Sequence, residues 1–159
     1  MHRAPYVADA ASTDEVHQLV KTTVEGFGSL DGRVLNAGIV RAGMVGELRD
    51  EDWKATVRTN LTGPFRILRA AIPQLVAARG AIVGVASAAA LRASGGIPGY
   101  NATKAGLTML VQSVAVDYGP LPGCVRTPYA PAGPEPKWPT WKCKSTVPTE
   151  WGNRHRPES

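Results

Sequence analysis

The run Ala-Ile-Val-Gly-Val-Ala at residues 81–86 constrains the fold more than any other feature of the sequence. A near-continuous apolar run of this length is typical of a strand that is buried on both faces of a parallel sheet. Residues 62–78 before it and residues 99–118 after it have helical patterns. Strands that alternate with helices in this way predict an α/β domain built from strand–helix units.

The N-terminal part of the chain begins the same alternation. Residues 6–8 predict a short strand. Ser12 and Thr13 are both suitable N-caps for the helix that follows, because a side-chain oxygen at this position accepts a hydrogen bond from the first turn. Gly26 and Gly28 end that helix. This segment therefore predicts one complete strand–helix unit.

A second strand is predicted to begin at Val34 and to run into residues 36–38. Arg33 precedes it at a position where an apolar residue is expected, so a charge would be buried at a cost in stability. A further short helix is predicted around Trp53 and Val57. These elements complete the predicted α/β pattern as far as the apolar run described above.

The composition changes after residue 120. Residues 119–159 hold nine of the 13 prolines and three of the four tryptophans, without a helical or strand period. Pro-rich composition is typical of extended or disordered chain. We therefore expect residues 1–120 to form one domain and residues 121–159 to be an irregular or disordered tail.

Charge and hydropathy exclude several classes of protein. The net charge is +5, but no dense Lys/Arg cluster is present, so nucleic-acid binding is not expected. No run of about 18 apolar residues is found, so no membrane span is expected. Cys124 and Cys143 lack metal-ligand spacing, and we expect no metal site, with both thiols free in a reducing cytoplasm.

Tyr100 and Lys104 form the strongest chemical motif of the sequence. They are four residues apart in a predicted helix, so their side chains share one face. A phenol normally loses its proton near pH 10, and a nearby ammonium favours the phenolate, which lowers the pKa of the tyrosine. Ser87 ends the predicted strand thirteen residues earlier, where its hydroxyl can hold a substrate oxygen. The three residues together indicate general acid–base chemistry.

Each of these residues also has an ordinary structural interpretation. A lysine on a helix most often lies on a solvated face, and a tyrosine is most often a half-buried packing residue. A serine after a strand is often the cap of a turn or helix. The motif Tyr-x-x-x-Lys alone therefore does not decide between catalysis and packing, and the decision depends on the sequence around it.

That surrounding sequence resembles the short-chain dehydrogenase/reductase family. Pro-Gly-Tyr-Asn-Ala-Thr-Lys-Ala-Gly-Leu at residues 98–107 is similar to the family's active-site helix. Residues 82–87 resemble the strand that delivers the catalytic serine, thirteen residues before the tyrosine. Asn60 in Asn-Leu-Thr-Gly matches the catalytic asparagine, and Leu-Asn-Ala-Gly at residues 35–38 resembles the Asn-Asn-Ala-Gly motif. The resemblance extends over about residues 5–120.

The resemblance implies a fold, a reaction and a set of site residues. The fold would be a partial, doubly wound (Rossmann-like) three-layer sandwich with a parallel sheet. The reaction would be hydride transfer between NAD or NADP and an alcohol or ketone. The implied catalytic residues are Tyr100 as general acid/base, Ser87 at the substrate oxygen, Lys104 at the tyrosine and the nicotinamide ribose, and Asn60 in a proton relay.

The resemblance also implies where the coenzyme binds and how chains associate. Asp9 lies twenty-seven residues before Asn36 and falls where the family contacts the adenine ring. The coenzyme contacts expected by resemblance are Asp9, Asn36, Ala37, Gly38, Tyr100 and Lys104. The helices at about residues 62–78 and 99–118 resemble those through which the family forms a dimer or tetramer.

Two parts of the family pattern are not found in the sequence. No Gly-rich turn of the kind that holds a coenzyme pyrophosphate precedes Asp9, and the residue that selects NAD or NADP would lie in the same region. After the active-site helix, Leu121 runs directly into Pro122 and Gly123, where the family has a further strand. We therefore expect an incomplete sheet and marginal stability.

Three hypotheses remain from the sequence. The first is an oxidoreductase that uses a nicotinamide coenzyme on an alcohol or ketone. The second is a catalytically inactive remnant of such an enzyme that acts as a helix-mediated association module. The third is the product of a split, truncated or frame-shifted gene, an idea that the unusual tail favours. Coenzyme binding separates the first hypothesis from the other two.

Overall fold

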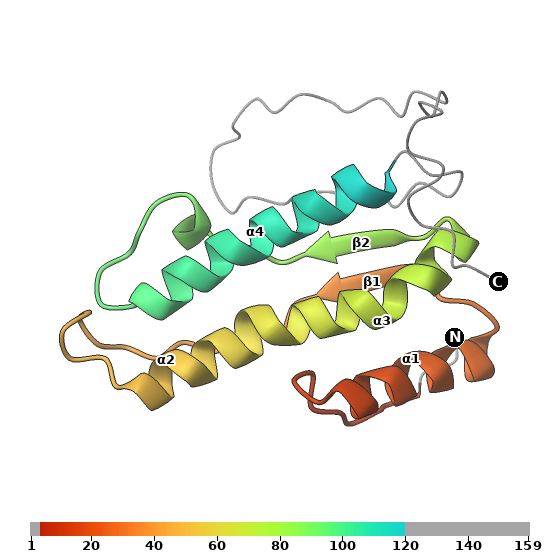
Figure 1. Ribbon diagram of the computed structural model, residues 1–159, viewed down its shortest axis with the longest axis horizontal. Helices are drawn as coiled ribbons and strands as arrows, with labels where there is room; N and C mark the ends of the chain where they lie inside the picture. The colour runs from red at the N-terminus through yellow and green to blue at the C-terminus, as the bar shows by residue number, and fades with distance from the viewer. Residues whose placement is uncertain (1–3, 120–159) are drawn as a thin grey trace, which may run out of the picture.

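The computed structural model describes residues 4–119, which form a parallel two-stranded sheet covered on one face by helices (Figure 1). Strands β1 (Gly32–Leu35) and β2 (Ala81–Gly84) pair in register, Gly32 opposite Ala81 and Leu35 opposite Gly84. The α/β class with a parallel sheet is confirmed, and the doubly wound, three-layer arrangement is incomplete as expected, with one helix layer among the described residues. The predicted tail at residues 121–159, with both cysteines, lies outside the described residues.

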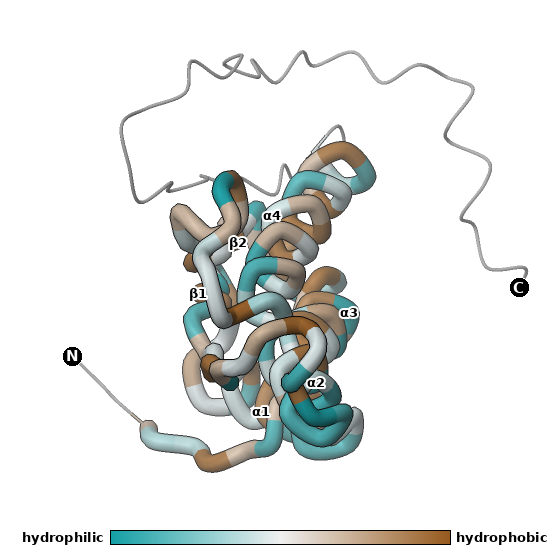
Figure 2. Tube along the Cα trace, turned by 90° about the vertical axis from the view of Figure 1, so that its left-hand side faces the viewer, coloured by the Kyte–Doolittle hydropathy of each residue, from teal (hydrophilic) through white to brown (hydrophobic). Residues whose placement is uncertain are grey.

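The helices lie side by side in one layer, with α3 between α1 and α4 (Figures 1 and 2). None of the described helices is long and apolar enough to cross a membrane. A π-helical turn at Arg58–Thr62 joins α2 to α3, and a 3-10 turn at Ala88–Ala90 follows β2. The helices are α1 (Thr13–Phe27), α2 (Asp50–Val57), α3 (Gly63–Ala78) and α4 (Pro98–Tyr118).

Helix α1 begins at a predicted cap and ends at Gly28, one of the two glycines predicted to end it. Ser12 is the N-cap, and its hydroxyl oxygen accepts a hydrogen bond of 3.4 Å from the Glu15 N–H. Gly28 closes the helix with a φ of +83°, a conformation that favours glycine, and its N–H donates to the Val24 carbonyl over 2.8 Å. Gly26 lies inside the helix and does not end it.

The core lies between the sheet and the helix layer. Ile82 and Leu35 point from the strands toward the helices and are 0% and 4% exposed. Gly84 on the same face lets α4 approach closely, because a Cβ there would lie 2.9 Å from Val111 Cγ2. The helices contribute further buried side chains to this core, namely Val16, Ile67, Leu68, Ala71, Leu75, Leu107, Val111 and Val114.

The other face of the sheet is open among residues 4–119, which corrects two predictions. Residues 81–86 are not buried on both faces, since Val34 is 57% exposed and Val85 is 37% exposed. Residues 6–8 do not form a strand, and Val7 is 98% exposed. A short strand is stabilised by pairing with a neighbour, and the described sheet consists of β1 and β2 alone.

Arg33 is partly buried in an unfavourable way, as its sequence position suggested. It pairs in register with Ile82, so its side chain starts on the helix-facing side of the sheet. Its Nε atom is buried and has no hydrogen-bond partner among the described residues. Burial also lowers the pKa of the guanidinium. Arg33 therefore reduces the stability of this domain.

We predict that Arg33→Leu raises the free energy of unfolding by about 1–2 kcal/mol, because it removes an unpaired buried polar group and adds apolar surface to the core. Urea denaturation followed by circular dichroism measures the change. Arg92→Leu, at an exposed arginine of the loop after β2, is the matched control and should stay near wild type. A destabilised Arg33→Leu variant contradicts this interpretation.

Candidate active site

The predicted site residues gather at one edge of the sheet. Because β1 and β2 are parallel, their carboxyl ends lie together, and residues 36–38 leave β1 at the same edge at which Ser87 follows β2. The first turns of α4 bring Tyr100 and Lys104 to this edge. A Cβ at Gly38 would lie 3.5 Å from Asn60 Oδ1 and 3.6 Å from Lys104 Nζ, so these three residues meet.

Asn60 connects the two halves of this edge. It is 1% exposed and lies in the π-helical turn, a feature that often occurs at functional sites. Its Oδ1 accepts from the Ile39 N–H over 2.8 Å, and its Nδ2 donates to the Ile39 carbonyl over 2.9 Å. The same Nδ2 donates to Thr103 Oγ1 over 3.1 Å. One amide thus joins the loop after β1 to helix α4.

Thr103 is a site residue that the sequence reasoning missed. It is 1% exposed, and its hydroxyl accepts from Asn60 and donates to the Tyr100 carbonyl over 3.1 Å. The signal was available in the helical spacing, since Thr103 lies three residues after Tyr100 and directly before Lys104. The sequence alone does not show the hydrogen-bond partner of a threonine inside a helix, so Thr103 could not be distinguished from the packing residues around it.

Lys104 is not on a solvated helix face. It is 4% exposed, and its Nζ donates to the Val85 carbonyl over 2.7 Å. Burial lowers the pKa of this ammonium from its usual value. Nζ also lies 5.6 Å from the centre of the Tyr100 ring, so the predicted pairing on one helix face is present. A buried cation beside a phenol is suited to proton transfer.

Ser87 is the cap of a turn, which is the structural role that the sequence allows for it besides catalysis. Its Oγ accepts a hydrogen bond of 3.2 Å from the Ala89 N–H and caps the 3-10 turn. A serine hydroxyl has one proton and two acceptor sites, so this cap leaves the proton to donate elsewhere. Ser87 lies two residues after Val85, whose carbonyl binds Lys104, and so it stays at the same strand end.

Asp9 lies apart from the residues around Asn60, before the start of α1. Its Oδ1 accepts from the Ala11 N–H over 2.8 Å, and its Oδ2 forms an ion pair with Arg58. Arg58 begins the π-helical turn that carries Asn60. The predicted adenine contact is therefore linked to the rest of the site by a residue that the sequence reasoning did not select.

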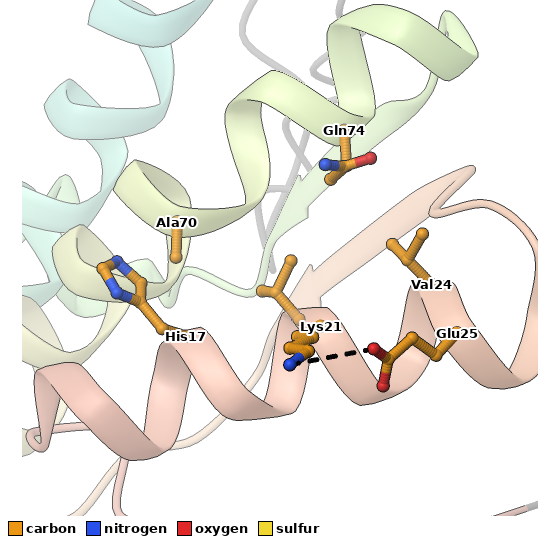
Figure 3. A pocket seen from close by; sticks show the side chains of 7 residues that line it. His17, Lys21, Val24, Glu25, Ala70 and Gln74 are labelled. Atoms are coloured by element: carbon orange, nitrogen blue, oxygen red, sulfur yellow. Dashed lines mark ion pairs between the residues drawn. The ribbon is translucent and has the colours of Figure 1, made fainter.

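Two hollows of the described surface lie elsewhere. One of about 330 Å³ lies between α1 and α3, where Lys21 and Glu25 form an ion pair of 3.8 Å (Figure 3). Another of about 330 Å³ lies beside Trp53 and Pro98. Neither includes the predicted catalytic residues. The hydrogen bonds of Asn60 and Lys104 define the position of the candidate site at the sheet edge.

We predict that Asn60→Ala lowers the free energy of unfolding by about 2–4 kcal/mol, because it leaves both backbone groups of Ile39 without their partner. The matched control is Asn101→Ala. Asn101, in the first turn of α4, also makes two hydrogen bonds, to the backbone of Ser94, but both are exposed to solvent, and their loss should cost about 1 kcal/mol. Equal losses in urea denaturation contradict the bridging role of Asn60.

We predict a pH signature for Lys104. The folded state holds its proton less tightly than the unfolded state, whose pKa is near 10.5, so the unfolded chain binds more protons between the two values. The stability of the native protein should therefore rise with pH through that window, relative to Lys104→Met, which does not titrate there. Denaturation of both proteins at several alkaline pH values tests this. A difference that stays constant or falls contradicts it.

Comparison with known proteins gives a consistent result. The model of the family described as short chain dehydrogenase matches residues 2–132. An uncharacterised NAD-dependent oxidoreductase of Mycobacterium tuberculosis is 41% identical over 113 residues, which are 70% of this chain and 41% of that protein. A 3-oxoacyl-(acyl-carrier-protein) reductase of Staphylococcus aureus is 38% identical over 109 residues, 68% of this chain and 44% of the relative. The chain thus spans less than half the length of these two relatives.

Solved structures agree in fold. An alcohol dehydrogenase from the archaeon Thermococcus sibiricus, in complex with 5-hydroxy-NADP, has a TM-score of 0.72 at 27% identity. The matched region is 78% of this chain and 51% of that structure. A ligand-free aldohexose dehydrogenase of Thermoplasma acidophilum has a TM-score of 0.70 at 27% identity, over 74% and 48% of the two chains. Because the family model matches residues 2–132, the chain belongs to the short chain dehydrogenase family.

Proposed function

We propose that this chain carries the proton-transfer half of an oxidoreductase site that interconverts an alcohol and a ketone with NAD or NADP. The observation that best supports this is the position of Lys104, whose amine is bound to the Val85 carbonyl and lies close to the Tyr100 ring. Family membership supports the class of reaction. A relative named as an NAD-dependent oxidoreductase supports a nicotinamide coenzyme, and one named as a 3-oxoacyl-(acyl-carrier-protein) reductase supports a carbonyl substrate.

In this proposal, Tyr100 gives its hydroxyl proton to the substrate oxygen during reduction and removes it during oxidation. Ser87 donates its remaining proton to the same oxygen, as its capping role permits. Lys104 keeps two N–H donors beyond the one used by Val85, and these are available for the phenol and a ribose hydroxyl. Asn60 holds the loop and helix around Lys104 and, by resemblance, supports a water that relays protons to it.

The residues present fit the nicotinamide end of the coenzyme. Asn36, Ala37 and Gly38 are exposed at the sheet edge, and a glycine beside Asn60 and Lys104 leaves the backbone open to close approach. The bound coenzyme supplies or accepts a hydride at the substrate carbon. Among residues 4–119 no Gly-rich turn follows a strand and opens a helix, so this part of the chain offers no such pyrophosphate site.

We predict that NADH or NADPH changes its fluorescence when titrated with the purified chain. Tyr100→Phe should leave that binding within about two-fold and reduce ketone turnover by about 100-fold or more, because it removes the proton donor and keeps the ring. Tyr118→Phe, at the other end of the same helix, is the matched control and should leave turnover unchanged. Turnover that survives in Tyr100→Phe contradicts the assignment of the acid.

A second candidate is an association module without catalysis. Phe65 on α3 and Met109 and Val116 on α4 are 46%, 60% and 70% exposed, which supports a homodimer or tetramer through these helices. Unchanged nicotinamide fluorescence at millimolar coenzyme excludes the oxidoreductase for this chain. A defined dimer in light scattering of that same sample would then favour the association module.

A further inference from the structure

Thr103 is buried near the start of α4 and bonds to two segments of the chain. Its hydroxyl accepts from Asn60 Nδ2 and donates to the Tyr100 carbonyl, each over 3.1 Å. Thr103 and Asn60 are 43 positions apart, and each is 1% exposed. The two hydrogen bonds therefore form a buried connection from the π-helical turn to the residue that carries the phenol.

A hydroxyl that donates to a carbonyl of the preceding turn is ordinary in a helix. Thr56 donates to the Asp52 carbonyl over 2.7 Å, and Thr108 donates to the Lys104 carbonyl over 3.0 Å. Of these three threonines, Thr103 alone also accepts a hydrogen bond from a distant segment among the described residues. That second bond fixes the helix relative to its neighbour, which a bond within one helix does not do.

The direction of these bonds sets the orientation of the Asn60 amide. A threonine hydroxyl has one proton, and the Tyr100 carbonyl can only accept, so the proton points to that carbonyl. Thr103 must then accept from Asn60, which turns the NH₂ group of the amide toward α4. The amide oxygen Oδ1 accepts from the Ile39 N–H over 2.8 Å. Thr103 thus enforces the same amide orientation that the loop after β1 requires.

The first turn of α4 needs an anchor of this kind. Its N-cap is Ile97, which makes no side-chain capping hydrogen bond. A helix end without such a bond leaves backbone N–H groups without a partner and frays more readily. Asn101 ties this turn to the Ser94 backbone, but both bonds are exposed to solvent. The buried bond of Thr103 is the stronger anchor of the turn that carries Tyr100, because water does not compete for it.

We propose that Thr103 is a positioning residue that sets the separation between the Tyr100 turn and the loop at Gly38. Its partner Asn60 lies against that loop, since a Cβ at Gly38 would be 3.5 Å from Oδ1. The inference rests on the proposed function, in which this loop meets the nicotinamide end of the coenzyme.

The separation of these two segments affects the reaction because each carries one reagent. Reduction of a ketone adds a hydride from the coenzyme to the carbon and the Tyr100 proton to the oxygen. It leaves oxidised coenzyme and a tyrosinate, which regains a proton from water. Both reagents must reach a single carbonyl group, so a small displacement of one segment slows the step without weakening the binding of either ligand.

The test replaces Thr103 with valine, which keeps the shape of the side chain, and with serine, which keeps the hydroxyl. Reduction of ethyl acetoacetate, a small 3-oxo ester, is measured with NADH and with NADPH, and coenzyme fluorescence counts the chains that bind. We expect Thr103→Val to lower kcat per binding chain by about ten-fold and to leave KM within about two-fold. Thr103→Ser should recover most of the native kcat.

Hydrogen exchange without coenzyme gives a second readout. Loss of the Thr103 hydroxyl frees the Asn60 amide to turn, so the Ile39 N–H should exchange about ten-fold faster in Thr103→Val and near the native rate in Thr103→Ser. Thr108→Val is the matched control, because it removes a hydroxyl that donates to the Lys104 carbonyl further along the same helix. It should change neither readout.

The inference alone is overturned if the native chain is active and Thr103→Val keeps the native kcat, whatever the exchange at Ile39. It is also overturned if Thr103→Ser loses as much activity as Thr103→Val, which indicates packing of the branched side chain. Fewer binding chains with an unchanged kcat per chain indicate a role in stability only, and they overturn it as well. A native chain that binds neither NADH nor NADPH overturns the proposed function, and the inference with it.

Discussion

The hydrogen bonds of the Asn60 side chain are the interaction on which the rest of the site depends. One buried amide satisfies both backbone groups of Ile39 and reaches Thr103 on the neighbouring helix. Strand β1 is only four residues long, so its own ladder does little to fix the loop that follows it. Asn60 supplies that constraint from the helix layer, and it also sets the distance between Gly38 and Lys104.

The burial of Lys104 follows from this arrangement. A lysine ammonium loses much of its hydration when it is buried, and the Val85 carbonyl returns one hydrogen bond. This is tolerated because α4 packs against β2 without a side chain between them at Gly84. The same close packing places the carbonyl of Val85 within reach of the helix. The chemistry of the site thus depends on a glycine in a strand that takes no part in it.

Much of this was accessible from the sequence because it is encoded locally. The cap at Ser12, the helix that carries Tyr100 and Lys104, and the parallel pairing of strands near residues 34 and 82 all follow from short-range patterns. The resemblance of the Asn-Leu-Thr-Gly motif predicted a site position for Asn60, and the structure places Asn60 near Gly38 and Lys104. Contacts between distant segments were not accessible, and so Thr103, Arg58 and the Val85 carbonyl were missed.

The wrong predictions have a common physical cause. Residues 6–8 and the apolar run at 81–86 have compositions typical of strands in a complete sheet, with neighbours on both edges and both faces. Their local composition suits such surroundings, but composition records what a segment prefers and not what is beside it. In the described residues the neighbours are missing, and Val7 and Val34 are exposed instead.

The π-helical turn at Arg58–Thr62 has a consequence for the spacing of the whole helical segment from Asp50 to Ala78. It accommodates one residue more than a regular α-helix would, and each residue of an α-helix rotates the next by about 100°. Deleting a single residue there would restore a regular helix. It would also turn either Asn60 or the apolar stripe of α3 away from its partners. The helical segment therefore keeps the Asn60 side chain and the core-facing stripe in different angular registers, and the irregular turn separates them.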